Sequence, residues 1–414
     1  NFPSTAKELT RLFQITNPNT KIDGVIAVNF SLIEDLLEVT GPVKIEGKEY
    51  NKDNIFENLE NDVNNIDRHN VEDLKNRKSI LKPLSNELIK KILFNPFKLR
   101  KISDTVTLSL AKKDLQLYFE NPSLERLIQK ENWSGAWPEK FKGDFLAVVE
   151  ANLGGMKSDR YIQRNILYKV TISEAALAGK EPIKARVEMN IKHYGIENIP
   201  LSGPYTGYIR FYSSPQNNIQ ADEIIKMMPG TEKNITKEYE LDPKVIANKE
   251  YNLFIPKQSG TDDYYTLIIE LPRGYTIQTK DFDAKENIAI FEGKLTRDQE
   301  FKLQIIDDKN PPRLILQELK EMGKVSIHFN EDLSPEEASD PFNYEITDLD
   351  ANHPEKTDQL KIKKVVTTSK DIDIYLDGMT NQPEEHYGVN IKNLRDTHGN
   401  RYADRQVTVV QRLE

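Results

Sequence analysis

The sequence predicts a mixed α/β region at the N-terminus, followed by two consecutive β-sandwich regions, and three observations lead to this fold class. Up to about residue 155, short β-branched runs alternate with segments whose apolar residues recur at helical spacing. From there to residue 310, strand-like segments follow one another with turn residues between them. The rest of the chain repeats this pattern with shorter strands. We therefore expect three domains, 1–155, 156–310 and 311–414.

The opening of the α/β region is predicted to be a helix, a buried strand and a second helix. Apolar residues at i, i+3 and i+4 from Leu9 fall on one face of the first helix. Residues 22–29, IDGVIAVN, are β-branched as in a strand, and residues 31–39 place four apolar side chains on one helix face. Gly41 can adopt the positive φ that follows a helix, and Pro42 cannot continue one.

The remaining elements of the α/β region are predicted from shorter signals. They are a hairpin turning at Glu46-Gly47, helices over about 53–63, 69–93, 102–119 and 123–131, and a nearly continuous apolar strand over 143–154. Pro83 is expected to kink or break the helix that contains it.

The two β regions are predicted as strands separated by turns, with one exception. Residues 221–228, ADEIIKMM, could form a helix. Charges followed by Pro311-Pro312 mark a linker in DDKNPPRL. Several tyrosines between residues 205 and 265 could stack on sugars, but their period-2 placement favours a position in the core.

The composition excludes several classes of function. The net charge is −9 and no long basic run occurs, so we expect no nucleic-acid partner. The absence of cysteine excludes disulfides, thiolate metal sites and cysteine nucleophiles. No window of about 18 apolar residues occurs, so no segment is expected to span a membrane. Because the chain opens at Asn1 without a signal peptide, we expect a piece of a longer precursor that is membrane-anchored upstream.

Two sets of residues resemble the bacterial domain-of-unknown-function 4012 family. The first is FPSTAKEL followed by DGVIAVNFSLIEDLLEVTGPVKIEGKEYN, and the second is ANLGGMKSDRYIQRNILYKV, which together imply the family over residues 1–310. The strand, helix and Gly-Pro pair are also similar to part of the LytR–CpsA–Psr fold, here as an incomplete layer. Enzymes of that fold transfer polyprenyl-phosphate-linked glycopolymers to the cell wall, and they hold the pyrophosphate with arginines.

The resemblance to LytR–CpsA–Psr enzymes implies a phosphate-binding site at Arg68, Arg77 and Lys78, because arginine forks suit phosphate oxygens. The alternative is a solvated helix face with ion pairs such as Asp73–Arg77. Such an enzyme needs Mg²⁺ held by convergent carboxylates, and Asp23, the acidic residue on the first strand, is better explained as a turn or cap. We therefore expect no cofactor, and Mg²⁺ only if the chain is enzymatic.

The tail is similar to bacterial immunoglobulin-like (Ig-like) modules of surface-layer and cell-wall proteins. The matching stretches are VSIHFNEDLSPEEASDPFNYEI and YGVNIKNLRDTHGN. Asp396 and Asn400 in the final turn offer oxygens that could hold Ca²⁺. The commoner explanation is a hairpin turn in which Gly399 takes a positive φ and Asp396 bonds the backbone.

These features predict an extracellular protein of the bacterial cell envelope, at the cell surface or cell wall. We expect a structural, adhesion or surface-assembly role without catalysis. Two alternatives remain: a Mg-dependent phosphotransferase of the LytR–CpsA–Psr type, and a binder of cell-wall glycan or lipid-linked glycan. An incomplete α/β sheet leaves an open edge. We expect that edge to pair with the chain's own N-terminal fragment or with neighbouring copies.

Overall fold

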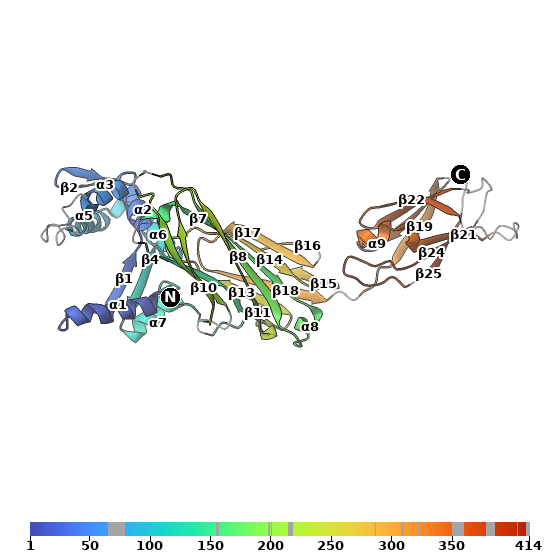
Figure 1. The fold of residues 1–414 in the computed structure, drawn as a ribbon, viewed down its shortest axis with the longest axis horizontal. Helices are drawn as coiled ribbons and strands as arrows, with labels where there is room; N and C mark the ends of the chain where they lie inside the picture. The colour runs from blue at the N-terminus through green and yellow to red at the C-terminus, as the bar shows by residue number, and fades with distance from the viewer. Residues whose placement is uncertain are drawn as a thin grey trace.

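The computed structural model describes residues 1–64, 79–138, 140–154, 157–197, 199, 201–213, 218–285, 287–307, 310–321, 323–349, 360–377, 386–403 and 405–410. Figure 1 shows three parts in a row, which we name the N-terminal unit (residues 1–131), the central unit (144–307) and the C-terminal unit (314–410). Helices gather in the first unit, and strands dominate the other two. This confirms the predicted order of a helix–strand region followed by largely β-sheet regions.

The N-terminal unit combines helices with two small antiparallel sheets, β1–β4 and β2–β3. Its elements are α1 (Phe2–Thr16), β1 (Gly24–Val28), α2 (Phe30–Thr40), β2 (Val43–Ile45), β3 (Lys48–Tyr50), α3 (Ile55–Asn64), α5 (Leu81–Leu93), η1 (Pro96–Lys98), α6 (Leu99–Ala111), β4 (Leu115–Phe119) and α7 (Pro122–Lys130). Helices α2, α3, α5 and α6 enclose one apolar core with the β2–β3 hairpin. Helix α1 packs separately on the β1–β4 sheet through Phe2 and Ala6.

The strand–helix–Gly-Pro unit forms where the sequence predicts it. The side chain of Asn29 accepts a hydrogen bond from the Phe30 N–H at 2.8 Å and so caps α2. At the other end, Gly41 has a φ of +88° and its N–H donates to the Leu37 carbonyl at 2.8 Å. Pro42 then leads directly into the β2–β3 hairpin.

One element of this unit differs in type from the prediction. The sequence predicts a helix through residue 119, but α6 ends at Ala111 and Leu115–Phe119 form β4. Lys113 has a φ of +62°, which a right-handed helix cannot contain. Strand β4 then pairs antiparallel with β1 along its whole length. Because helical spacing alone cannot distinguish a short apolar strand from the end of a helix, the distant partner strand decides.

The central unit holds three sheets in the part of the chain that the structure describes. Their strand orders are β10-β9-β6, β11-β8-β7-β14-β17-β16 and β12-β13-β18-β15, with β5 beside β13. The elements are β5 (Asp144–Phe145), β6 (Ala147–Asn152), η2 (Ser158–Tyr161), β7 (Ile162–Thr171), α8 (Glu174–Leu177), β8 (Ile183–His193), β9 (Tyr205–Ser213), β10 (Asn218–Met227), β11 (Glu232–Leu241), η3 (Pro243–Val245), β12 (Ile246–Ala247), β13 (Glu250–Ile255), β14 (Tyr264–Glu270), β15 (Tyr275–Gln278), β16 (Asp283–Lys285), β17 (Ile288–Lys294) and β18 (Gln299–Asp307).

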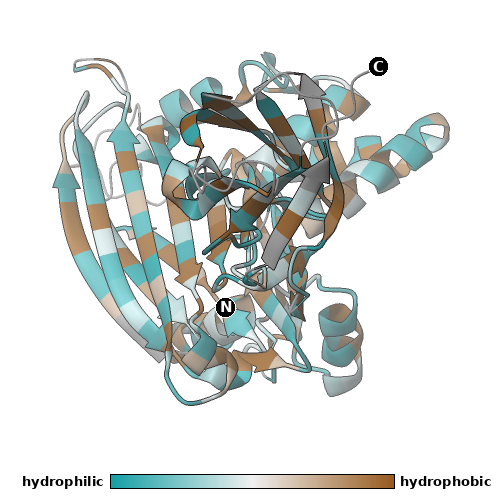
Figure 2. Ribbon diagram, turned by 90° about the vertical axis from the view of Figure 1, so that its right-hand side faces the viewer, coloured by the Kyte–Doolittle hydropathy of each residue, from teal (hydrophilic) through white to brown (hydrophobic). Residues whose placement is uncertain are grey.

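The core of the central unit is formed by strands in which apolar, buried residues alternate with more exposed ones. Buried and more exposed residues alternate along β7, β8 and β9, so one face of each strand joins a single large apolar core. Figure 2 shows this alternation as brown and teal bands along the long strands. The suggested helix at 221–228 is wrong, because these residues fall mostly in β10, which pairs along β9.

The strand predicted over residues 143–154 belongs to the sheets of the central unit. It forms β5 and β6, which pair with β13 and β9 respectively. Leu146 and Val148 lie in the central core. A nearly continuous apolar strand is covered on both faces, and its sequence does not reveal which sheet supplies that cover.

The C-terminal unit has two facing sheets of strand order β19-β20-β23-β22 and β21-β24-β25. Its elements are β19 (Leu314–Glu321), β20 (Lys324–Phe329), α9 (Pro335–Ser339), η4 (Pro341–Asn343), β21 (Tyr344–Asp348), β22 (Lys361–Thr367), β23 (Asp371–Asp377), β24 (His386–Ile391) and β25 (Arg405–Val410). Its buried residues form a core of their own. Residues 310–313 of the predicted linker contain neither helix nor strand.

Within the described residues, no helix has the length and apolar character needed to cross a bilayer.

Candidate functional site in a polar cleft

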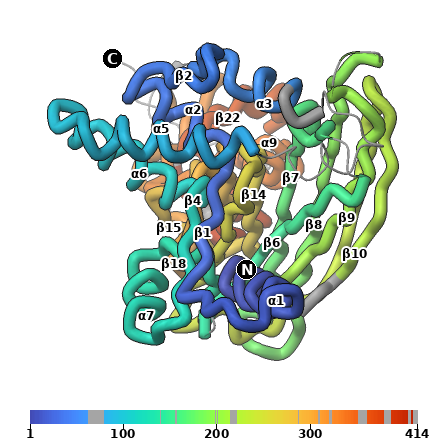
Figure 3. Tube along the Cα trace, turned by 90° about the vertical axis from the view of Figure 1, so that its left-hand side faces the viewer, coloured from blue at the N-terminus to red at the C-terminus, as the bar shows by residue number. Residues whose placement is uncertain are grey.

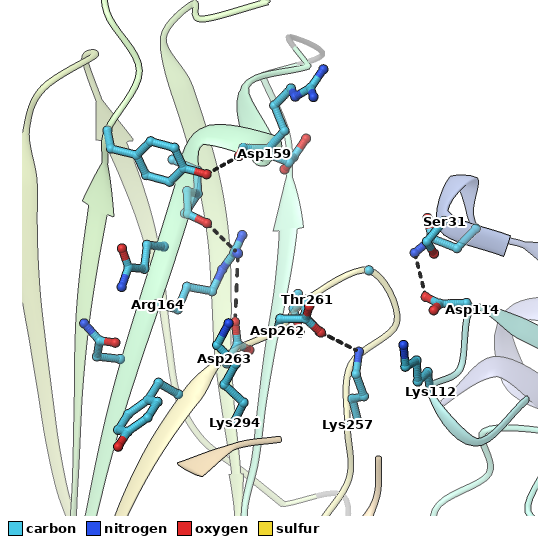
Figure 4. A pocket seen from close by; sticks show the side chains of 18 of the residues that line it. Ser31, Lys112, Asp114, Asp159, Arg164, Lys257, Thr261, Asp262, Asp263 and Lys294 are labelled. Carbon is cyan, nitrogen blue, oxygen red and sulfur yellow. Dashed lines mark hydrogen bonds and ion pairs between the residues drawn. The ribbon is translucent and has the colours of Figure 1, made fainter. Parts of the chain in front are cut away.

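A polar cleft of about 670 Å³ lies where the N-terminal and central units meet (Figure 4). Its walls come from the start of α2, the turn after α6, η2, β7, the residue after β8, the loop between β13 and β14, and the end of β17. Most lining side chains are polar, and the charged ones are Lys112, Arg160, Arg164, Lys257, Lys294, Asp35, Asp114, Asp159, Asp262 and Asp263. Five cations therefore face five carboxylates, and the cleft has little net charge.

The first wall is the junction between β1 and α2. The backbone N–H of Asn29 donates to the Asp114 carbonyl at 2.6 Å, and its side-chain amide donates to the Asp114 carboxylate at 2.9 Å. This double contact follows from the pairing of β1 with β4, because Asp114 immediately precedes β4 and Asn29 immediately follows β1. The carboxylate of Asp114 is thereby held at the edge of the cleft.

The opposite wall contains a buried ion group on β7. Arg164 forms an ion pair with Glu150 of β6 through Nε, and its Nη1 donates to the Ile162 carbonyl at 3.3 Å. The same Nη1 lies 3.9 Å from the Asp263 carboxylate. Burial raises the pKa of the Asp263 carboxyl, while the positive charge of Arg164 acts in the opposite direction. One buried cation is thus shared between two carboxylates.

The loop between β13 and β14 closes on a buried lysine. The ammonium of Lys257 donates to the carbonyls of Thr261 at 2.5 Å and Gln258 at 3.1 Å. Burial lowers the pKa of Lys257, although the nearby carboxylates of Asp262 and Asp114 favour its charged form. The loop therefore wraps around the Lys257 side chain, and Asp262 and Asp263 of the same loop line the cleft (Figure 4).

A second buried ion pair lies beside the cleft loop and joins the two units. Lys113 of the N-terminal unit lies 2.6 Å from Asp298 of the central unit, and the two side chains are 3% and 5% exposed. The same carboxylate accepts hydrogen bonds from the Lys257 N–H at 2.7 Å and from the Asn132 amide at 3.0 Å. Asp298 therefore joins the two units to the cleft loop at one point.

The cations at the rim of the cleft make fewer ion pairs than those in its walls. Lys112 and Lys294 form no ion pair with a carboxylate of the described residues. Tyr194 and Tyr264 line the same rim, and the Tyr194 hydroxyl donates to the Arg160 carbonyl at 2.7 Å. Aromatic rings beside hydrogen-bonding groups and cations suit a hydroxyl-rich ligand that carries an acidic group.

The structure does not test the predicted phosphate site. Arg68, Arg77 and Lys78 lie outside the described residues, so their role stays a prediction. The side chain of Asp23 is largely exposed and lies 2.8 Å from the Lys21 ammonium.

The predicted calcium residues lie in a hydrogen-bonded turn. Asp396 is buried, and its two carboxylate oxygens accept hydrogen bonds from the Asn400 N–H at 2.7 Å and the Asn400 amide at 2.8 Å. Gly399 has a φ of +87°. In the described chain, one group of three acidic or histidine side chains lies close enough to share an ion, namely Glu331, Asp396 and His398. Calcium binding stays a prediction, and this group lies in the C-terminal unit, outside the cleft.

The charged residues of the cleft are absent from the sequence predictions. Arg164 occupies an inward position in the alternating strand IQRNILYKV, and a cation at such a position is a usable signal of a buried ion pair. Asp298 and Lys113 carry no comparable signal, because both lie in short turns and meet only through the docking of two units.

Comparisons with known proteins match parts of the chain. The family model described as "Protein of unknown function (DUF4012)" matches residues 1–63, which confirms that resemblance over those residues. The search of curated proteins gives no match. Among solved structures, the chain is similar to the N-terminal part of the bacterial S-layer protein SbsC and to its domains 1–6, at 17% identity and a TM-score of 0.22 in both cases. Each match covers 25% of this chain, and only 24% and 14% of those chains.

Proposed function

We propose that this chain is a non-catalytic structural component of the bacterial cell envelope, displayed at the cell surface or in the cell wall. The observation that carries the proposal is the arrangement of units with separate apolar cores in one extended row (Figure 1). Such a row spans distance and presents its far end for contact. The cleft between the first two units supports the same role, because its buried charges are compensated by one another rather than held ready for a reaction.

The C-terminal unit supports an Ig-like assignment through its topology. Numbered in chain order, its strands fall into sheets 1-2-5-4 and 3-6-7. An immunoglobulin constant-type sandwich has the same arrangement, with strands A, B, E and D in one sheet and C, F and G in the other. This topology suits modules that are joined in series and displayed on surfaces.

We further propose that the N-terminal unit is an incomplete LytR–CpsA–Psr-like layer whose β1 edge takes a strand from another polypeptide. Within the described residues β1 pairs with β4 alone, so its other edge offers free backbone groups. Ile26 and Val28 of β1 are exposed, as are Leu12 and Phe13 of α1. The strand would come from the chain's own N-terminal fragment or from a neighbouring copy. The sequence proposes three domains, 1–155, 156–310 and 311–414, and the pairing of β5 and β6 with β13 and β9 moves the first boundary to before Asp144.

The proposal is tested on intact cells and on the purified chain. Antibodies against the C-terminal unit should label intact cells, and added protease should remove that unit without lysis. The partner proposal predicts that Ile26→Lys with Val28→Lys abolishes self-association or retention of an N-terminal fragment, measured by analytical ultracentrifugation. Labelling only after permeabilisation would refute the surface location. A chain that stays monomeric and retains no fragment would refute the open edge.

A second candidate function is binding of a cell-wall glycan or lipid-linked glycan in the cleft. The specific observation that favours it is the rim, where Tyr194 and Tyr264 stand beside Lys112 and Lys294. Calorimetric titration with soluble wall fragments should show binding that Tyr264→Ala and Lys294→Glu each weaken.

The catalytic alternative, a Mg-dependent LytR–CpsA–Psr-type phosphotransferase, requires phosphate release from a polyprenyl pyrophosphate that Arg77→Ala abolishes.

A further inference from the structure

The turn between α5 and α6, residues 89–101, exposes a cluster of large apolar side chains. Phe97 is 99% exposed and Phe94 is 81% exposed. Ile89, Leu93 and Leu99 are also exposed. These residues are additional to the core, because the opposite faces of α5 and α6 already pack into the N-terminal core. Exposed large apolar side chains this close together in one hairpin mark a contact surface rather than the usual scatter of single apolar residues.

The same turn is strongly basic in an acidic protein. Residues 89–101 contain five cations, Lys90, Lys91, Lys98, Arg100 and Lys101, and no carboxylate, whereas the whole chain has a net charge of −9. Lys90 pairs with Glu87 at 2.7 Å, and Lys91 donates to the Gly41 and Pro42 carbonyls. The other three cations form no ion pair with a described carboxylate. Positive charge therefore surrounds the apolar cluster.

Helix stability favours Lys90 and Lys91 in the last turn of α5, but it does not explain the cations at the start of α6. The N-terminus of a helix carries a partial positive charge, so acidic residues are favoured there and cations are not. Lys98 is nevertheless the N-cap residue of α6, and Arg100 and Lys101 follow in its first turn. The first helical turn of α6 contains no acidic residue, and no side chain caps the N-terminus of this helix. The arrangement is unfavourable for the isolated helix and favourable for contact with an anionic surface.

The position of the turn in the molecule also suits a surface contact. The α5–α6 hairpin projects sideways from the body at the N-terminal end (Figure 3). The C-terminal unit lies at the opposite end of the row (Figure 1). The turn is therefore open to a surface that approaches from the side of the N-terminal unit, far from the C-terminal unit.

We propose that the α5–α6 turn, residues 89–101, is a peripheral membrane-contact site that inserts its phenylalanines among the headgroups of anionic phospholipids. Aromatic and aliphatic side chains partition into the interface between headgroups and acyl chains, and lysine and arginine bind anionic headgroups. The five cations disfavour pairing of this turn with the same turn of a second copy, and large apolar side chains surrounded by cations are the combination that binds an anionic bilayer. The inference goes beyond the proposed structural role, because it assigns the N-terminal unit a direct contact with the bilayer.

The test is co-sedimentation of the full chain with vesicles at low salt. Vesicles of phosphatidylcholine with about 30% phosphatidylglycerol are compared with vesicles of phosphatidylcholine alone, since a basic site prefers the anionic surface. We expect binding to the anionic vesicles that decreases with added salt. The variants Phe94→Ser with Phe97→Ser, and Lys98→Glu with Arg100→Glu, should each lower the partition coefficient by roughly tenfold or more. Phe94, Phe97 and Arg100 are exposed and Lys98 is half-buried, and none of the four belongs to the N-terminal core, so the fold should persist, as circular dichroism checks.

Matched controls lie elsewhere on the chain. Phe342→Ser removes a phenylalanine that is 91% exposed in the C-terminal unit, and Lys180→Glu with Lys280→Glu reverses two exposed cations of the central unit. These variants should bind vesicles as the parent chain does. The proposal is overturned if the parent chain ignores anionic vesicles, or if the serine variant and the Phe342→Ser control bind equally. Self-association that depends on Phe97, without vesicle binding, would also overturn it and assign the surface to a second copy.

Discussion

A buried carboxyl in the central unit should make its stability fall as the pH rises. Asp144 is fully buried, and one of its oxygens accepts hydrogen bonds from the hydroxyls of Tyr168 at 2.6 Å and Tyr251 at 2.5 Å. Burial raises the pKa of Asp144 from 3.8 to about 6, although the two tyrosine hydrogen bonds act in the opposite direction. The folded state therefore holds a proton that the unfolded state has already released.

The sign and size of the effect follow from this difference in pKa. Below pH 3.8 the carboxyl is mostly protonated in both states, and its full contribution to stability is present. As the pH rises to about 6 the unfolded state ionises first, so stability is lost, and the loss is complete above pH 6. Each tenfold difference in the acid constant corresponds to about 1.4 kcal/mol, so the total is about 3 kcal/mol. Between pH 4 and pH 7.5, this amounts to about 2–3 kcal/mol.

The perturbation is Asp144→Asn, which keeps the shape and an acceptor oxygen for the tyrosines but removes the ionisation. The measured quantity is the difference in free energy of unfolding between the variant and the parent chain, from urea titrations at several pH values. Because other titrating groups are common to both chains, the difference isolates Asp144. We expect the variant to gain about 2–3 kcal/mol relative to the parent between pH 4 and pH 7.5, or about 5–10 °C in the midpoint of the central unit.

A second variant tests whether Asp144 is the cause of the pH dependence. Tyr251→Phe removes one hydrogen bond to the ionised carboxylate, so it should raise the pKa of Asp144 further and steepen the loss of stability. In the Asp144→Asn background, the same tyrosine substitution should have no pH dependence. A difference between Asp144→Asn and the parent that is constant with pH, or that favours the parent as pH rises, would refute the reasoning.

Three further predictions concern stability. Lys113→Met should cost about 3–5 kcal/mol in urea titrations because it leaves the Asp298 carboxylate buried without its cation, and Asp298→Asn in the same chain should recover part of this loss. A cost near zero for the single variant would contradict the buried pair. Phe301→Ala should cost about 3–5 kcal/mol, since this ring is 1% exposed and packs against other aromatic side chains of the central core. Gly399→Ala should lower the free energy of unfolding by about 1 kcal/mol or more, because φ is +87° and the added Cβ would lie 3.2 Å from the Cβ of Arg273. A melting temperature equal to that of the parent chain would count against the strained turn.

Local patterns predict the elements whose causes are local. The strand, helix and Gly-Pro stop around residues 22–42 form as expected because capping, apolar spacing and the positive φ of Gly41 all act within a few residues. The β regions are predictable for the same reason, since alternation is written along each strand. In the C-terminal unit, Gly399 and Asp396 form the turn that their residue types favour.

Elements that depend on distant partners are harder to predict. Strand β4 is a strand because β1 pairs with it, and its own sequence fits a helix equally well. Strand β10 likewise takes its conformation from β9. The buried ion pair beside the cleft is a stronger case, because its lysine and aspartate come from positions 113 and 298 and meet only after two units dock. Sequence reasoning lists charged residues but does not tell which of them become buried together.

The buried charges between the first two units explain how the molecule keeps one shape. A buried ion pair adds little net stability over apolar side chains of the same volume, but separating its partners leaves a buried charge uncompensated. Lys113 and Asp298 therefore act against any other docking of the N-terminal unit, and Arg160, which lies over the Phe56 ring at 4.3 Å, adds a second contact between the same units. The α5–α6 turn is thus held in a fixed direction relative to the central unit. If that turn rests on a bilayer, the direction in which the central unit leaves the membrane is set by these contacts.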